Sequence, residues 1–134
     1  MYARIIIALS LEHGYSLRAI KTARRLAAKG AEIHGVHVYE APSGTVSTYL
    51  DAEVVTKAWN DAQARLAARL KDAPDVTPVM LKGHSSRSLV EYANETGADL
   101  IIAGSHKPGL SDYFLGTTAA RLVRHAPCTV MVLR

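Results

Sequence analysis

The sequence predicts an α/β fold in which helices cover both faces of a five-stranded parallel sheet. Short apolar runs rich in β-branched residues, such as residues 5–9 and 100–103, are typical of strands buried on both faces. Segments with apolar residues at helical spacing alternate with these runs, which indicates right-handed βαβ units. The chain has 134 residues, and we expect residues 1–134 to form a single domain.

The first half of the chain supplies two helices around the second strand. A helix is predicted at 16–29, because Ser16 is a residue type that caps helix starts and Gly30 one that ends them. The second strand is predicted at 31–39. A long helix is predicted at 47–71 from its hydrophobic period. Its apolar stripe consists of Val55, Trp59, Ala62, Leu66 and Leu70.

The segment after this long helix supplies the third strand and a further helix. The strand is predicted at 75–81, and it belongs at an edge of the sheet because Pro78 has no N–H to donate to a ladder. The helix is expected to begin with a capping box of Ser88 and Glu91 and to end at Gly97.

A glycine-rich connection between the last two strands is the strongest candidate for a ligand site. The fourth strand is predicted at 100–103, a helix from Thr117, and the fifth strand at 129–133 after Pro127. Backbone N–H groups of such a loop, with the start of a helix, suit an anion such as a phosphate. Ligands of open α/β sheets bind at the carboxyl ends of the strands, so we expect Ser10 to lie beside this loop.

Composition excludes several classes of protein. Apolar residues make up 49% and charged residues 21% of the chain, as in soluble globular proteins. The net charge is +4, but Lys and Arg are spread along the chain, so we expect no nucleic-acid partner. The apolar run at 5–9 is too short to span a membrane. Cys128 has no second cysteine to pair with, which favours a reducing, cytoplasmic setting.

The end of the chain resembles a known family. The motifs are Gly-Ser-His-Lys-Pro at 104–108, Leu-Gly-Thr at 115–117 and Val-Arg-His-Ala-Pro-Cys-Thr-Val-Met-Val-Leu-Arg at 123–134. With the order of the elements, they resemble the universal stress protein family over the whole chain, and most of all its F/G-type, ATP-binding branch. The resemblance implies an adenine nucleotide alpha-hydrolase-like sandwich with strand order 3-2-1-4-5. It also implies a regulatory module of the stress response that binds ATP, with or without Mg²⁺.

Two departures separate this chain from the nucleotide-binding motif of the family, G-x2-G-x9-G-[ST]. Lys107 stands in place of the second glycine, and only the eight residues at 108–115 separate it from Gly116. Ser10 stands where the family places an aspartate that meets the ribose. Gly109 offers the missing backbone freedom, and Lys107 offers a point charge for a phosphate.

The resemblance assigns a set of candidate ligand-binding residues. The adenine of the family's nucleotide binders rests on backbone near the end of the second strand, which corresponds to Val38 in this chain. The candidate residues are Ala8, Leu9, Ser10, Val38, Ala103, Gly104, His106, Lys107, Gly109, Gly116, Thr117 and Thr118.

The last strand predicts a partner. Residues 129–133 are apolar with no helix left to cover their outer edge, and such an edge is satisfied by pairing with a second copy. The family pairs through this strand, so we expect a homodimer that signals to a regulatory partner protein; the F/G-type branch also allows a tetramer. Two alternatives remain open at this stage, namely a slow ATPase or phosphotransferase and an interaction dimer that binds no nucleotide.

Two other chemistries find little support in the sequence. Ser105, His106 and Asp112 do not form a catalytic triad in any recognisable motif, because no Gly-x-Ser-x-Gly elbow surrounds the serine. His34 and His37 lack the spacing and the cysteine partners of a metal site. We therefore expect no catalytic residue and no protein-held metal.

Overall fold

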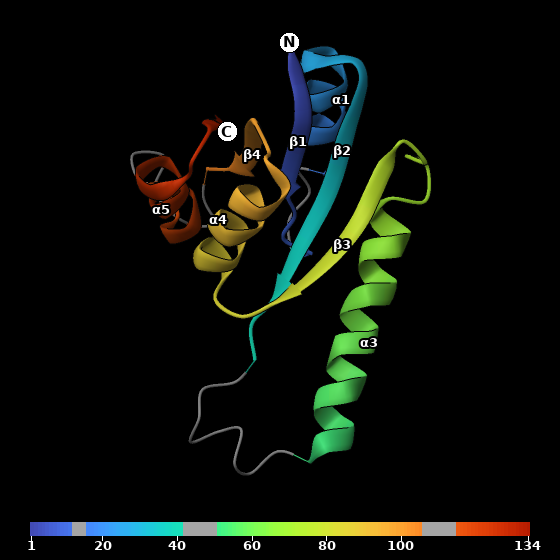
Figure 1. Cartoon of the computed structure of the whole chain (residues 1–134). Helices are drawn as coiled ribbons and strands as arrows, with labels where there is room; N and C mark the ends of the chain where they lie inside the picture. Colours follow the sequence, from blue (N-terminus) through green and yellow to red (C-terminus); the bar gives the residue numbers. More distant parts are fainter. Residues whose placement is uncertain (12–15, 42–50, 106–114) are drawn as a thin grey trace.

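The computed structural model describes residues 1–11, 16–41, 51–105 and 115–134. They contain a parallel sheet of five strands in the order β3-β2-β1-β4-β5 (Figure 1). This arrangement confirms the predicted class and strand order, and it confirms that the strand containing Pro78 lies at an edge. The strands are β1 (Tyr2–Ala8), β2 (Ala27–Tyr39), β3 (Val76–Lys82), β4 (Leu100–Gly104) and β5 (Thr129–Leu133).

Helices cover both faces of the sheet because neighbouring strand side chains point to opposite faces. Ile5 and Ile7 of β1 pack with buried residues of α1 (Ser16–Leu26) and α3 (Ala52–Arg69). Ile6 packs on the other face with residues of α4 (Ser85–Thr96) and α5 (Thr117–His125). The three isoleucines are fully buried, so the central strands have an apolar cluster on each side, as their continuous apolar run predicts.

The first helix is shorter than predicted. It ends at Leu26, and β2 begins at Ala27, so residues 27–29 belong to the strand. Ala27 pairs with Tyr2, and the register then shifts so that Arg4 pairs with Glu32. Gly30 lies inside this irregular stretch with φ of +78°, a conformation that glycine adopts without strain. The glycine therefore accommodates a strand irregularity instead of ending the helix.

The capping box of Ser88 and Glu91 predicted for the start of α4 is wrong, whereas the predicted end of this helix is confirmed. α4 begins three residues before Ser88, and the backbone N–H of Ser88 donates to the carbonyl of His84 inside the first turn (2.9 Å). The carboxylate of Glu40 accepts from the backbone N–H of Ser85 (2.8 Å) and so supplies the cap from another element. Gly97 ends the helix in the left-handed conformation, with φ of 69°.

α3 reaches beyond the end of the sheet (Figure 1). Its start is capped by Asp51, whose side chain accepts from the backbone N–H of Glu53 (3.0 Å). Residues 47–50, with which the predicted helix begins, lie outside the described residues. The helix ends at Arg69, two residues before the predicted end at Lys71. Leu66 is buried against the sheet, and Trp59 packs edge-on against Tyr39 of β2 with ring centroids 5.9 Å apart.

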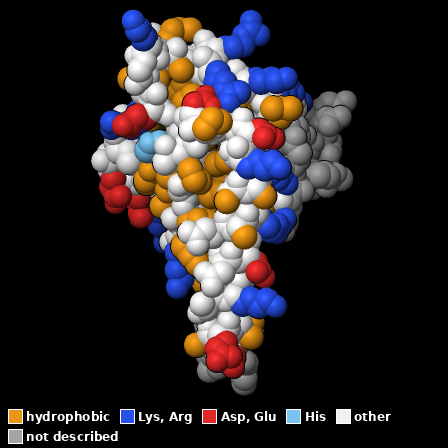
Figure 2. All heavy atoms as spheres, turned by 90° about the vertical axis from the view of Figure 1, so that its right-hand side faces the viewer, with side chains coloured by type: hydrophobic (Ala, Val, Ile, Leu, Met, Phe, Trp, Pro, Cys, Tyr) orange, Lys and Arg blue, Asp and Glu red, His pale blue; other side chains and the backbone are white. Residues whose placement is uncertain are grey.

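Figure 2 shows the face that carries α3 and the β3 edge. Lys and Arg side chains are interspersed there with Asp and Glu, and apolar side chains lie between them. The described residues on this face form no continuous basic surface of the kind that binds a nucleic-acid backbone.

Candidate functional site

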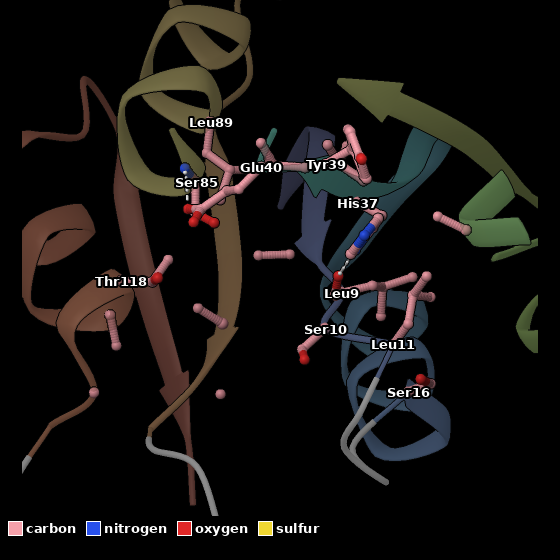
Figure 3. A pocket seen from close by; sticks show the side chains of 18 of the residues that line it. Leu9, Ser10, Leu11, Ser16, His37, Tyr39, Glu40, Ser85, Leu89 and Thr118 are labelled. Atoms are coloured by element: carbon pink, nitrogen blue, oxygen red, sulfur yellow. Dashed lines mark hydrogen bonds between the residues drawn. The ribbon is translucent and has the colours of Figure 1, made fainter. Parts of the chain in front are cut away.

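A cavity of about 800 Å³ opens at the carboxyl ends of β1, β2 and β4. It is the place at which open α/β sheets bind ligands. Figure 3 shows Ser10, His37 and Tyr39 along one side of it and Thr118 on the other. The predicted residues that line the cavity are Ala8, Leu9, Ser10, Val38, Ala103, Gly104, Gly116, Thr117 and Thr118. His106, Lys107 and Gly109 lie outside the described residues, and a ligand-binding role for the whole set stays a prediction.

The start of α5 presents backbone donors on the β4 side of the cavity. Its N-cap is Gly116, which has no side chain to cap the helix. The first backbone bond across this turn runs from the N–H of Ala120 to the carbonyl of Gly116 (3.0 Å). The N–H groups of Thr117, Thr118 and Ala119 precede it, and such groups have no partner within their own helix. With the positive end of the helix dipole, they form a suitable environment for an anion.

Gly116 has φ of −62° and ψ of 157°, which any residue can adopt. The backbone conformation therefore does not require a glycine here. What the glycine provides is the absence of a Cβ beside the cavity.

The backbone of Ser105 forms hydrogen bonds to β5 and to Gly116, at the two ends of the glycine-rich connection. Its backbone N–H donates to the carbonyl of Leu133 in β5 (2.8 Å), and its carbonyl accepts from the N–H of Gly116. The residue is only 1% exposed. It is therefore a structural residue and not an accessible nucleophile.

The opposite side of the cavity is formed where β1 and β2 separate. The N–H of Leu9 donates to the carbonyl of Val36 (2.8 Å), and this is the last backbone bond between the described parts of the two strands. In a parallel strand, the backbone polar groups of every second residue point to the same side. Val38 therefore turns its N–H and C=O toward the side where β1 has ended, and it lines the cavity.

His37 is a cavity residue that the sequence reasoning considered only as a metal ligand. Its Nδ1 lies 2.9 Å from the carbonyl oxygen of Leu9 (Figure 3). Because a carbonyl only accepts, the proton lies on Nδ1 and donates to Leu9. The side chain thus binds the carbonyl of the first residue beyond β1.

α3 forms the outer wall next to His37. Ala58 and Ala62 line the cavity there, and their small side chains leave room between the helix and β2. Arg65 donates to the carbonyl of Leu11 (2.8 Å), and Arg69 donates to the same oxygen (2.7 Å). The two arginines hold the chain that leaves β1 against α3. The sequence predicted that Ala62 lies on the apolar stripe of this helix, but only the fold shows that α3 lines the cavity.

The rim near α4 joins a histidine to an arginine. Nη1 of Arg121 lies 2.7 Å from Nε2 of His84, and Nδ1 of His84 lies 3.2 Å from the hydroxyl of Ser86. Arginine only donates, so Nε2 of His84 accepts in this contact. Arg121 thereby places a cation on the same side of the cavity as the start of α5. Sequence reasoning missed this pair, because 37 residues separate its members.

Within the described residues, no group of three or more His, Cys, Asp or Glu side chains is arranged to hold a metal ion. No helix in the described ranges has the length and apolar character needed to cross a bilayer.

The whole chain, residues 1–134, matches the model of the universal stress protein family. It is also 32% identical to universal stress protein G of Shigella flexneri, and the match covers 100% of both chains. The chain belongs to the universal stress protein family. This confirms the resemblance, and the G-type relative agrees with the branch that the motifs indicate.

Solved structures show the same fold. A hypothetical protein whose biochemical function was assigned from its structure superposes with a TM-score of 0.81, at 22% identity, over 99% of this chain and 96% of its own. The universal stress protein of Archaeoglobus fulgidus, solved in complex with dAMP, superposes with a TM-score of 0.61, at 18% identity, over 99% of this chain and 98% of its own.

Proposed function

We propose that this universal stress protein is a regulatory module that binds an adenine nucleotide in the cavity at the carboxyl ends of β1, β2 and β4. The observation that carries the proposal is the pairing, within one cavity, of an anion-binding helix start with a backbone edge that suits a base. Adjacent strands lie about 4.8 Å apart, so β4 and β2, with β1 between them, lie about 10 Å apart. That separation is suited to a phosphate on the β4 side and a base on the β2 side, with the ribose near Ser10.

Val38 supports adenine as the base. One edge of adenine has a ring nitrogen that accepts a hydrogen bond beside an amino group that donates one. The N–H and C=O of Val38 form the complementary pair, and they require no particular side chain. The relative that carries dAMP shares this fold, and its ligand combines an adenine base with a phosphate.

The phosphates would lie at the start of α5. The N–H groups of Thr117 and Thr118 and the guanidinium of Arg121 are the described donors on that side. A Mg²⁺ ion accompanying ATP would be held mainly by phosphate oxygens, since the described carboxylates of the cavity, Glu40 and Asp61, form no three-ligand cluster. The site therefore favours binding over rapid phosphoryl transfer, for which an oriented acceptor and metal-holding carboxylates are needed.

Calorimetric titration of the purified chain with ATP and AMP tests the proposal. We expect saturable binding of both nucleotides, and heat extraction of freshly purified protein should release an adenine nucleotide. Absence of binding at about 1 mM, where a site of about −4 kcal/mol is half filled, would overturn the proposal. A dimer that binds neither nucleotide would then be the better description.

We also propose that β5 pairs with β5 of a second copy. β5 is an edge strand whose Val130, Met131 and Val132 are half-buried in the isolated chain. The carbonyl of Leu133 accepts from Ser105, the residue that follows β4, so the backbone groups of Val130 and Val132 point to the outer side of the sheet. Pairing along this outer side satisfies those groups and covers the apolar edge.

Two proline substitutions test the dimer. Val130→Pro removes an outward N–H, so we expect a folded monomer in sedimentation velocity experiments. Met131→Pro is the matched control, because it removes an N–H that faces β4 and should lower the melting temperature instead. A Val130→Pro protein that still sediments as a dimer would contradict the proposed interface.

A further inference from the structure

His37 has one ring nitrogen engaged and one available. Nδ1 donates to the carbonyl of Leu9, so Nε2 carries a lone pair. No second hydrogen bond of this ring occurs among the described residues, and the side chain lines the cavity. The same bond holds the ring in one tautomer, because the opposite tautomer would set two lone pairs against each other. His37 is therefore a fixed hydrogen-bond acceptor at the cavity.

We propose that Nε2 of His37 reads the exocyclic amino group of the bound base, so that the site selects a 6-aminopurine over a 6-oxopurine. This inference rests on the proposed function and assigns a specificity-determining side chain to it. The amino group of adenine carries two hydrogens. The carbonyl of Val38 takes one of them, and Nε2 of the adjacent residue takes the other.

The surroundings of His37 agree with a base at this end of the cavity. Ala58 and Ala62 of α3 and Leu9 after β1 provide small or apolar walls, as a flat ring requires. The helix-start donors and the guanidinium of Arg121 lie on the other side, at α5, whereas Arg65, the cavity-lining cation of α3, donates to the carbonyl of Leu11. His37, whose Nε2 is a fixed hydrogen-bond acceptor, thus lies at the end of the cavity that we assign to the base.

The same arrangement explains how an oxo base would be rejected. Inosine and guanine carry an oxygen at position 6, which accepts a hydrogen bond and donates none. This oxygen would face two acceptors, the carbonyl of Val38 and Nε2 of His37, and both would lose a partner on leaving water. A site that hydrogen-bonds a substrate group discriminates strongly against an analogue that lacks the group. If Val38 alone discriminated between the two bases, the selectivity would survive a change at His37. The contribution of the His37 side chain can therefore be measured by substitution.

The test is the ratio of ATP to ITP affinity, with AMP and IMP titrated in parallel. His37→Asn places its amide nitrogen where Nδ1 lies, so it keeps the bond to Leu9 but lacks an acceptor at the position of Nε2. We expect the wild-type ratio to fall about tenfold in this variant, as for the loss of one hydrogen bond. His37→Gln places its amide oxygen near the position of Nε2, and we expect it to restore most of the ratio.

A purely structural role of His37 predicts the reverse order, with His37→Asn close to the wild type and His37→Gln impaired. His34→Leu is the matched control, since His34 lies on the same strand but bonds Tyr92 away from the cavity (2.7 Å). It should lower stability and leave the ratio unchanged. ATP binding with an unchanged ratio in His37→Asn would overturn this inference alone, whereas absence of nucleotide binding by the wild type would overturn the proposed function with it.

Discussion

The two ends of the parallel sheet use their polar groups in different ways. At the amino end, polar side chains bind the backbone and one another. At the carboxyl end, polar groups border a cavity of about 800 Å³. Both ends belong to the same strands, so the difference does not follow from the sheet itself. It follows from what the connecting segments bring to each end.

The amino end is closed by Asp99. Its two carboxylate oxygens accept from the backbone N–H groups of Ala3 and Arg4 (2.8 and 2.9 Å), which lie at the start of β1. Burial acts to raise the pKa of Asp99, but the bonds from these two N–H groups, together with its own backbone N–H and the charge of the N-terminus, outweigh burial and lower the pKa. Nε of Arg4 in turn donates to Glu32 (2.7 Å). The strand ends there are satisfied within the protein, which is the pattern of a structural region.

The carboxyl end keeps donors and acceptors available. Gly116 caps α5 without a side chain, Val38 turns backbone groups toward the side where β1 has ended, and His37 presents a ring nitrogen. Leaving such groups without partners costs stability. We therefore expect changes at the amino end to alter folding and changes at the carboxyl end to alter binding.

Gly116→Val is expected to give the largest effect on binding. The backbone at this position is open to any residue, so the chain should fold, but the branched side chain would occupy the approach to the start of α5. We predict a loss of ATP affinity of about a hundredfold, which corresponds to about 2.7 kcal/mol. Calorimetry measures the affinity, and circular dichroism checks the fold. Unchanged affinity in a folded variant would place the phosphates elsewhere.

Asp99→Ala is expected to give the largest effect on stability. Removal of the carboxylate leaves two strand-start N–H groups without their partner, and we predict a loss of about 2 kcal/mol in the free energy of unfolding. Urea denaturation measures this loss. The affinity for ATP should stay within twofold of the wild type, because Asp99 lies at the opposite end of the sheet. A marked loss of affinity without a loss of stability would contradict the division between the two ends.

The stability that Asp99 contributes should depend on pH. A carboxyl group whose pKa is lower in the folded protein stabilises it above the unfolded pKa, and the contribution is lost as pH falls through the folded pKa. The wild type should therefore lose stability in the acid range more steeply than Asp99→Asn, which has no carboxyl proton to bind. Denaturation curves at a series of pH values from neutral to acid measure the two slopes. Parallel slopes would contradict the role assigned to the ionised carboxylate.

The sequence predicted the sheet more completely than the site. The alternation of apolar runs and amphipathic segments predicts a parallel sheet with helices on both faces. The family resemblance implied its strand order, and ligands of such sheets bind at the carboxyl ends of the strands, so the location of the cavity followed. The His84–Arg121 pair and the bond from His37 to Leu9 could not be predicted, because each depends on the approach of segments that are distant in the chain. The capping box failed for a related reason, since Glu40 of a different segment supplies the cap.

Gly97→Ala is expected to give the smallest effect, and it pairs with the change at Gly116. Gly97 ends α4 with φ of 69°, and an added Cβ would lie 3.7 Å from the guanidinium of Arg4, so the space is open but the conformation is strained. We predict a loss of stability of about 1 kcal/mol and an unchanged affinity for ATP. We therefore expect Gly97 to serve the backbone conformation and Gly116 the approach of a ligand. Thermal denaturation and calorimetry on both variants measure the contrast, and an affinity loss in Gly97→Ala would show that the two ends are coupled.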